Sequence, residues 1–135
     1  MEQVLAIVYL ALGSNLGERA GNITKALKQL GQNGVEVVKV SSYIETDPVG
    51  GPPQGLFINA AAKVETFLSP RELLTLIHQI ESSFGRQRLV KNGPRPIDID
   101  ILLYDNLQIA EPDLVIPHPR MKERDFVMRP LAEIF

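Results

Sequence analysis

The stretch that decides the fold reads Gly93-Pro94-Arg95-Pro96-Ile97-Asp98-Ile99-Asp100-Ile101-Leu102-Leu103-Tyr104. Within it, isoleucines alternate with aspartates, which is the period-two pattern of a β-strand. The isoleucines therefore point to one face of the strand, and Asp98 and Asp100 point to the other. Two carboxylates about 6–7 Å apart on one face repel each other and need a counter-charge to stay ionised.

The two aspartates admit two interpretations. A lone Asp-x-Asp most often marks an edge strand with a solvated face. Here Arg95 precedes the strand, and Arg86, Arg88 and Lys91 occupy the loop before it. Carboxylates are hard oxygen ligands that suit Mg²⁺, which commonly shares its coordination sphere with substrate phosphates. The combination favours a metal–polyphosphate site.

The composition predicts one soluble domain over residues 1–135. The chain has 135 residues, of which 44% are hydrophobic, and a net charge of −2. It therefore has no overall attraction to nucleic acid or to an anionic membrane. The absence of cysteine excludes disulfides and thiolate ligands. The apolar start lacks a basic n-region and is too short to span a bilayer, so we expect a cytoplasmic protein.

Hydrophobic periodicity and capping residues predict an α+β fold. Strands are expected at Val4–Leu12, Val35–Ile44, Leu56–Thr66 and from Ile97 onward, with helices at about Glu18–Leu30 and from Ser69 to Gly85. This βαββαβ order is typical of a ferredoxin-like fold. Such a fold is a four-stranded antiparallel sheet with the helices packed on one face, here followed by a C-terminal extension.

The connections between these elements carry further signals. Gly13-Ser14-Asn15 is expected to turn the chain from strand to helix, and Asp47–Gly55, with three prolines and three glycines, predicts a long loop. Residues 107–110 are expected to form a short strand that pairs back. The apolar tail, 126–135, is expected to pack on the core.

Four polar side chains have both a structural and a functional interpretation. Asn59 is either an edge residue or a donor and acceptor for a heterocycle. His78 and Glu81 share one helical face, which is either solvated or part of a site. His118 is fixed between two prolines and precedes a cationic segment.

Five motifs together resemble one known family. They are Gly13-Ser14-Asn15-Leu16, Phe57-Ile58-Asn59-Ala60-Ala61, Glu81 to Arg88, Gly93 to Asp100, and Pro117-His118-Pro119-Arg120-Met121. They closely resemble 6-hydroxymethyl-7,8-dihydropterin pyrophosphokinase of folate biosynthesis. The resemblance implies an ATP- and Mg²⁺-dependent enzyme that moves pyrophosphate from ATP to the pterin hydroxymethyl group and releases AMP. It also implies a C-terminus shorter than is usual for the family.

The resemblance also implies roles for individual residues. Asp98 and Asp100 would bind two Mg²⁺ ions. The residues involved in catalysis would be these aspartates together with Arg86, Arg88, Arg95 and Arg124. ATP binding falls to His78, Glu81, Arg86, Arg95, Ile101 and His118. Pterin binding falls to Thr46, Val49, Phe57, Asn59 and Phe126.

Other functions remain possible on the sequence alone. The first alternative is a catalytically weakened homologue that still binds ATP and the pterin. A metal-dependent phosphohydrolase would use the same aspartates. A nucleic-acid binder of this fold would need exposed aromatics and a broad basic face, which an acidic chain without tryptophan does not offer. We expect small-molecule substrates, no nucleic-acid or membrane partner, and a monomer.

Overall fold

The structure, a computed structural model, describes residues 4–85 and 93–135. Its elements in chain order are β1 (Ala6–Ser14), α1 (Arg19–Gln32), β2 (Val35–Val40), β3 (Ile44–Thr46), β4 (Phe57–Thr66), α2 (Pro70–Ser83), β5 (Asp98–Tyr104), β6 (Ile109–Glu111), β7 (Leu114–Ile116), a 3₁₀ turn (Met121–Glu123) and α3 (Asp125–Ile134). The α+β class is confirmed.

The main sheet has five strands, in the order β2-β4-β1-β5 with β3 also paired to β4. Every pairing in it is antiparallel. The apolar β1 lies between β4 and β5, the central place that its composition predicts. Asp98 pairs with Gly13, and Gly13 pairs with Asn59, so these three residues lie in one row across the strands.

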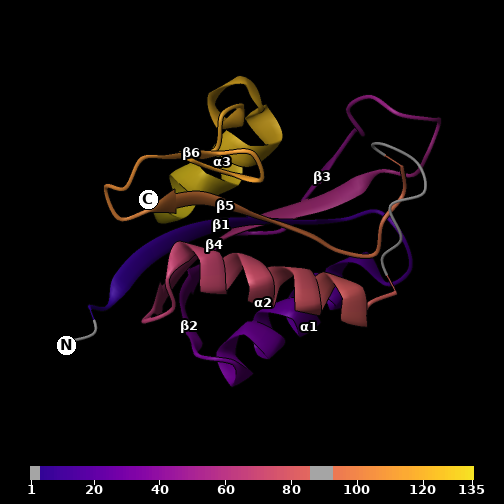
Figure 1. The fold of residues 1–135 in the computed structure, drawn as a ribbon. Helices are drawn as coiled ribbons and strands as arrows, with labels where there is room; N and C mark the ends of the chain where they lie inside the picture. The colour runs from indigo at the N-terminus through magenta and orange to yellow at the C-terminus, as the bar shows by residue number, and fades with distance from the viewer. Residues whose placement is uncertain (1–3, 86–92) are drawn as a thin grey trace.

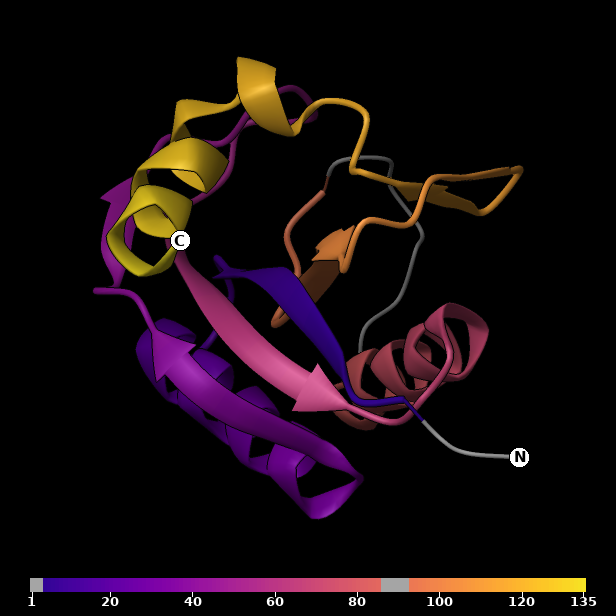
Figure 2. The same cartoon turned by 90° about the vertical axis from the view of Figure 1, so that its left-hand side faces the viewer.

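The two faces of the sheet are covered by different helices (Figures 1 and 2). α1 and α2 pack on one face, where Leu10, Leu12, Ile77 and other residues form the larger hydrophobic core. α3 covers the opposite face through a smaller cluster that includes Leu102 and Leu131. The C-terminal segment thus packs on the core as expected, but on the other side of the sheet from the long helices.

α2 begins as its sequence predicts. The Ser69 hydroxyl accepts from the backbone N–H of Glu72, and the Glu72 carboxylate accepts from the backbone N–H of Ser69. This capping box satisfies two otherwise free N–H groups of the first turn. It fixes the helix from which His78 and Glu81 project.

Three expectations about the elements were wrong in detail. The strand expected at 35–44 is divided into β2 and β3, so the main sheet has five strands rather than the expected four. The division arises because the buried Ser41 uses its hydroxyl as well as its N–H to bind Ala61 of β4. The segment expected to pair back near 107–110 is β6, which pairs with β7 in a separate hairpin. Gly13 is an interior residue of β1 rather than part of a turn.

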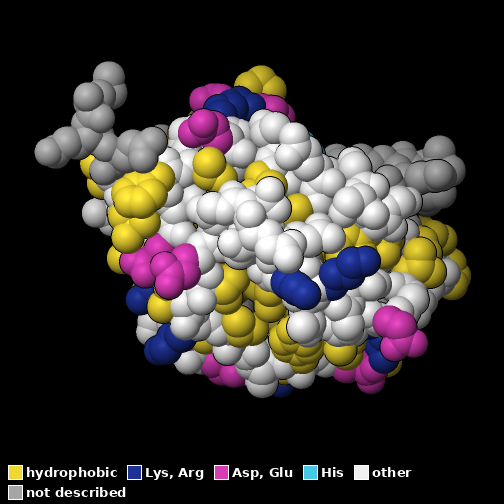
Figure 3. Space-filling view, turned by 90° about the horizontal axis from the view of Figure 1, so that it is seen from below, with side chains coloured by type: hydrophobic (Ala, Val, Ile, Leu, Met, Phe, Trp, Pro, Cys, Tyr) yellow, Lys and Arg dark blue, Asp and Glu magenta, His cyan; other side chains and the backbone are white. Residues whose placement is uncertain are grey.

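The surface over α1 and α2 mixes charged groups of both signs with hydrophobic side chains (Figure 3). An apolar groove on this side of the molecule is lined by Leu5, Leu27, Val35 and Phe67 among others. In the part of the chain that the structure describes, no helix is both long and apolar enough to cross a membrane.

Candidate active site

The β5 strand places its two aspartates as the alternation predicts. Ile97, Ile99 and Ile101 are buried in the core beneath α1 and α2. Asp98 and Asp100 are partly buried and lie on the opposite face of the strand. They line two separate cavities, so the pair forms the boundary between them.

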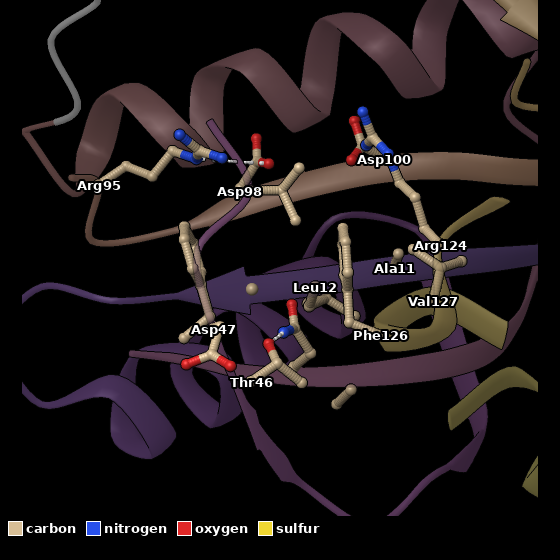
Figure 4. Close-up of a pocket in the computed structure, with 15 residues that line it drawn as sticks. Ala11, Leu12, Thr46, Asp47, Arg95, Asp98, Asp100, Arg124, Phe126 and Val127 are labelled. Atoms are coloured by element: carbon tan, nitrogen blue, oxygen red, sulfur yellow. Dashed lines mark hydrogen bonds and ion pairs between the residues drawn. The ribbon is translucent and has the colours of Figure 1, made fainter. Parts of the chain in front are cut away.

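The first cavity lies over β1 and β4 beneath the start of α3 (Figure 4). Its lining comprises Ala11, Leu12, Gly13, Thr46, Asp47, Val49, Phe57, Asn59, Ala60, Arg95, Asp98, Asp100, Arg124, Phe126 and Val127. Its volume is about 80 Å³. Its volume is therefore smaller than the several hundred Å³ of typical ligand pockets, and we refer to this cavity as the slot. All five residues predicted to bind the pterin lie in this one cavity.

One polar pair lies in this slot. The Asn59 Nδ2 donates a hydrogen bond to the Thr46 hydroxyl on the neighbouring strand β3. Asn59 is buried, with 8% of its surface exposed. A fixed amide in a buried wall distinguishes ligands by whether they satisfy its remaining donor and acceptor.

Two arginines lie over the aromatic side chains of the cavity. The Arg95 guanidinium carbon is 5.0 Å from the centre of the Phe57 ring, and that of Arg124 is 5.7 Å from the centre of the Phe126 ring. Arg95 Nε also lies 3.5 Å from Asp98 Oδ2. Arg95 and Arg124 therefore lie beside the two aspartates. Their positive charges would neutralise the negative charge of a bound polyphosphate there.

The second cavity lies between α2 and the β6–β7 hairpin. Its lining comprises Leu74, His78, Glu81, Asp98, Ile99, Asp100, Ile101, Pro112, Asp113, Leu114, Val115, His118 and Pro119, and its volume is about 360 Å³. Four residues predicted to bind ATP, namely His78, Glu81, Ile101 and His118, lie together here. Arg95 lines the first cavity instead, and Arg86 and Arg88 are outside the described residues.

Glu81 is a buried carboxylate with a defined structural partner. It is 4% exposed, and its Oε2 accepts a hydrogen bond of 3.0 Å from the backbone N–H of Ile99. Ile99 stands between the two aspartates on β5, the last strand of the sheet. Glu81 thus satisfies an outward N–H of an edge strand and fixes the backbone that carries both carboxylates.

His118 lies half-buried on the loop after β7. Burial lowers the pKa of its imidazole below the ordinary value, the nearby charge of Arg124 lowers it further, and Asp98 opposes them. His118 therefore stays neutral near pH 7. Its backbone N–H is tied to Leu102 O at 3.0 Å, which fixes the loop to β5.

Asn15, expected to lie in a turn, links three segments of the site. Its Oδ1 accepts from the backbone N–H of Arg95 at 2.9 Å. Its Nδ2 donates to Gln54 Oε1 at 2.7 Å and to Gly55 O at 3.1 Å. It therefore joins the end of β1 to the loop before β4 and to the segment carrying Arg95.

Sequence reasoning missed several residues that line the cavities. Asp47 lies between Thr46 and Val49, and its position at the start of the Pro/Gly loop was a usable signal. Leu74 lies one turn before His78 on the same face of α2, so helical spacing could have found it. No local signal in the sequence placed the hairpin residues Pro112, Leu114 and Val115 at the second cavity.

The donor set for a metal consists of the paired aspartates. Within residues 4–85 and 93–135, no group of three or more His, Cys, Asp or Glu side chains is arranged to hold a metal ion. Two carboxylates with open cavities on both sides fit Mg²⁺, which keeps waters and takes phosphate oxygens as its other ligands.

The fold and the site define an α+β protein with two cavities that meet at paired carboxylates. Residues 9–135 match the family of 7,8-dihydro-6-hydroxymethylpterin-pyrophosphokinase (HPPK). The chain belongs to this family.

Individual relatives agree with this assignment. The chain is 51% identical over 129 residues to a 2-amino-4-hydroxy-6-hydroxymethyldihydropteridine pyrophosphokinase of Bacillus subtilis, covering 95% of this chain and 77% of the relative. It is 45% identical over 130 residues to a protein of the same name from Aquifex aeolicus, covering 96% and 81%.

A solved structure of Plasmodium falciparum HPPK-DHPS has the same fold, with a TM-score of 0.75 at 16% identity. The match covers 98% of this chain and 42% of that one, so this chain spans about two fifths of the larger protein.

Proposed function

We propose that the chain transfers the diphosphoryl group of ATP to the hydroxymethyl oxygen of 6-hydroxymethyl-7,8-dihydropterin, giving the pterin diphosphate and AMP in folate biosynthesis. The observation that carries the proposal is the sharing of Asp98 and Asp100 by two cavities. A reaction that joins two substrates needs two binding sites with one reacting centre between them. Family membership supplies the identities of the two substrates.

The first cavity is assigned to the pterin. Its aromatic walls, Phe57 and Phe126, suit a flat bicyclic ring, and the Asn59 amide beside Thr46 offers the polar groups that would recognise the ring edge. The slot measures about 80 Å³, less than typical ligand pockets. Val49, which is exposed on the loop before β4, also lines this cavity.

The second cavity is assigned to ATP. Glu81 and His118 lie on its walls next to the backbone of Ile101. His118 would offer its imidazole to the triphosphate as a hydrogen-bonding group. Cationic neutralisation would come from Arg95 beside Asp98 and from Arg124. Roles for Arg86 and Arg88 remain predictions from the family resemblance.

Asp98 and Asp100 would hold Mg²⁺, two ions according to the family resemblance. When bound, the metal would neutralise phosphate charge and favour ionisation of the attacking hydroxyl. The pterin oxygen forms a bond to the β-phosphorus while the bond from that phosphorus to the α,β-bridging oxygen breaks. The electron pair leaves with AMP and the hydroxyl proton passes to solvent. The role of the protein is to hold both substrates in line for the transfer and to exclude water.

The test is AMP formation from ATP and Mg²⁺ with and without the pterin. We expect AMP only when the pterin is present, and nearly complete loss of turnover in Asp98→Ala and Asp100→Ala. Glu36→Ala, which removes an exposed carboxylate of β2 far from both cavities, should leave turnover unchanged. ATP binding without AMP formation would instead identify a catalytically weakened binding homologue. Hydrolysis of ATP in the absence of the pterin would identify a phosphohydrolase.

A further inference from the structure

Arg71, at the start of α2, holds two carboxylates at once. Its NH1 lies 2.7 Å from Asp113 Oδ2, and its NH2 forms a second ion pair with Glu111 Oε1. Both acids belong to the tip of the β6–β7 hairpin, where Glu111 ends β6 and Asp113 precedes β7. The hydrogen bond from Arg71 lowers the pKa of Asp113, so the carboxylate is charged at neutral pH.

The cluster of Arg71, Glu111 and Asp113 links the two elements that form the walls of the second cavity. α2 supplies Leu74, His78 and Glu81 to one wall, and the hairpin supplies Pro112 to Val115 to the other. The hairpin is anchored to the core near its end by the buried Leu114 and Ile116 of β7. Its tip, by contrast, is exposed and is tied to α2 by the Arg71 side chain.

We propose that Arg71 is a positioning residue for nucleotide binding, because its ion pairs to Glu111 and Asp113 fix the hairpin wall of the second cavity against α2. The inference rests on the proposed assignment of that cavity to ATP. Arg71 does not itself line the cavity, so it acts through the placement of Asp113 and its neighbours rather than through contact with the nucleotide.

A different role for Arg71 predicts a different result. If the guanidinium served only to cancel the negative charge of the two acids near a polyphosphate, removal of Glu111 would strengthen nucleotide binding. If Arg71 holds the hairpin in place, removal of Glu111 weakens nucleotide binding, since one of the two links is lost. Because Glu111 does not line the cavity, the effect of Glu111→Ala on nucleotide binding reports on the loss of its ion pair with Arg71.

The experiment measures binding of a non-hydrolysable ATP analogue with Mg²⁺, and separately of the pterin, by calorimetry. The variants are Arg71→Ala, Glu111→Ala and the double variant. Arg71→Ala should weaken binding of the analogue about three- to tenfold, and Glu111→Ala about twofold, as exposed ion pairs allow. The double variant should match Arg71→Ala. Pterin affinity should not change, because the first cavity contains no hairpin residue.

The matched control is Arg129→Ala, which breaks an exposed Arg129–Asp125 pair outside both cavities and should bind the analogue as wild type does. Tighter binding by Glu111→Ala, or unchanged binding by Arg71→Ala, would overturn the positioning role while leaving the proposed function standing. Wild-type protein that binds no analogue would overturn the proposed function and this inference together.

Discussion

The Oδ1 atom of Asn59 occupies the space that a side chain on Gly13 would need. A Cβ at Gly13 would lie 2.7 Å from that oxygen and 3.5 Å from Cδ1 of Phe57. The two residues are directly paired across β1 and β4. The position of the amide proposed to recognise the pterin therefore depends on the absence of a side chain on the neighbouring strand.

Gly13→Ala should displace Asn59 and weaken pterin binding by about tenfold, because a buried amide out of place leaves polar groups unpaired. ATP affinity should be nearly unchanged, since Gly13 lies outside the second cavity. Calorimetric titration with each substrate separates the two effects.

Gly31→Ala is the matched control for that variant. No atom lies within 4 Å of a Cβ added at Gly31 in α1, so the change should leave pterin binding intact and stabilise the helix by up to about 1 kcal/mol. Equal loss of pterin affinity in both variants would show that the contact with Asn59 is not the cause.

Glu81→Ala should lower the free energy of unfolding by about 2 kcal/mol, because the buried backbone N–H of Ile99 would lose its side-chain acceptor. Glu81→Gln retains an acceptor oxygen and should lose about half as much. Urea unfolding of the three proteins measures the difference. A Gln variant as unstable as the Ala variant would mean that the hydrogen bond to Ile99 contributes little.

Asn15→Ala should reduce both stability and turnover, since it removes the side-chain bonds to Arg95, Gln54 and Gly55. The expected loss of unfolding free energy is about 1–3 kcal/mol. Gln54→Ala removes one of these bonds and should show a smaller change. If Gln54→Ala were the more damaging variant, the link to Arg95 would not be the important one.

Stability should depend on pH through Glu133. Hydrogen bonds from the hydroxyl and backbone N–H of Ser42 lower the pKa of this carboxyl below its ordinary 4.5. A lowered pKa in the folded state gives stability that is present above the unfolded value and is lost as pH falls through the folded value. Glu133→Gln should therefore be less stable than wild type at neutral pH, and the difference in stability should narrow as the pH falls below the ordinary carboxyl pKa of 4.5.

Urea midpoints of wild type and Glu133→Gln at several pH values test this dependence. Glu36→Gln serves as the control, since it removes an exposed carboxylate of β2 that has no contact with Ser42. If the difference in stability between wild type and Glu133→Gln stayed constant with pH, the contact with Ser42 would not be its source.

The parts predicted correctly from sequence follow from short-range rules. Alternation along β5 sends the isoleucines into the core and the aspartates outward, and the capping box of α2 needs only Ser69 and Glu72. Both depend on spacing within a few residues, which a single sequence displays directly.

The parts that sequence reasoning missed depend on contacts between distant segments. The break between β2 and β3 results from hydrogen bonds of Ser41 to Ala61, twenty positions away. Asn15 finds its partners about 40 and 80 positions along the chain. The second cavity forms between α2 and the β6–β7 hairpin, which lie far apart in the sequence. Such pairings have no local periodicity, so they emerge only once the sheet is assembled.

The row of Asp98, Gly13 and Asn59 across three strands places a limit on changes of chain length. Loss or gain of one residue within β1, β4 or β5 would shift a strand by one position and exchange its two faces. The carboxylates or the amide would then point into the core while isoleucines faced the substrates. Insertions and deletions in this family should therefore be tolerated in the connecting loops, such as residues 47–55, and excluded from the parts of these three strands next to the row, where the pairing is regular.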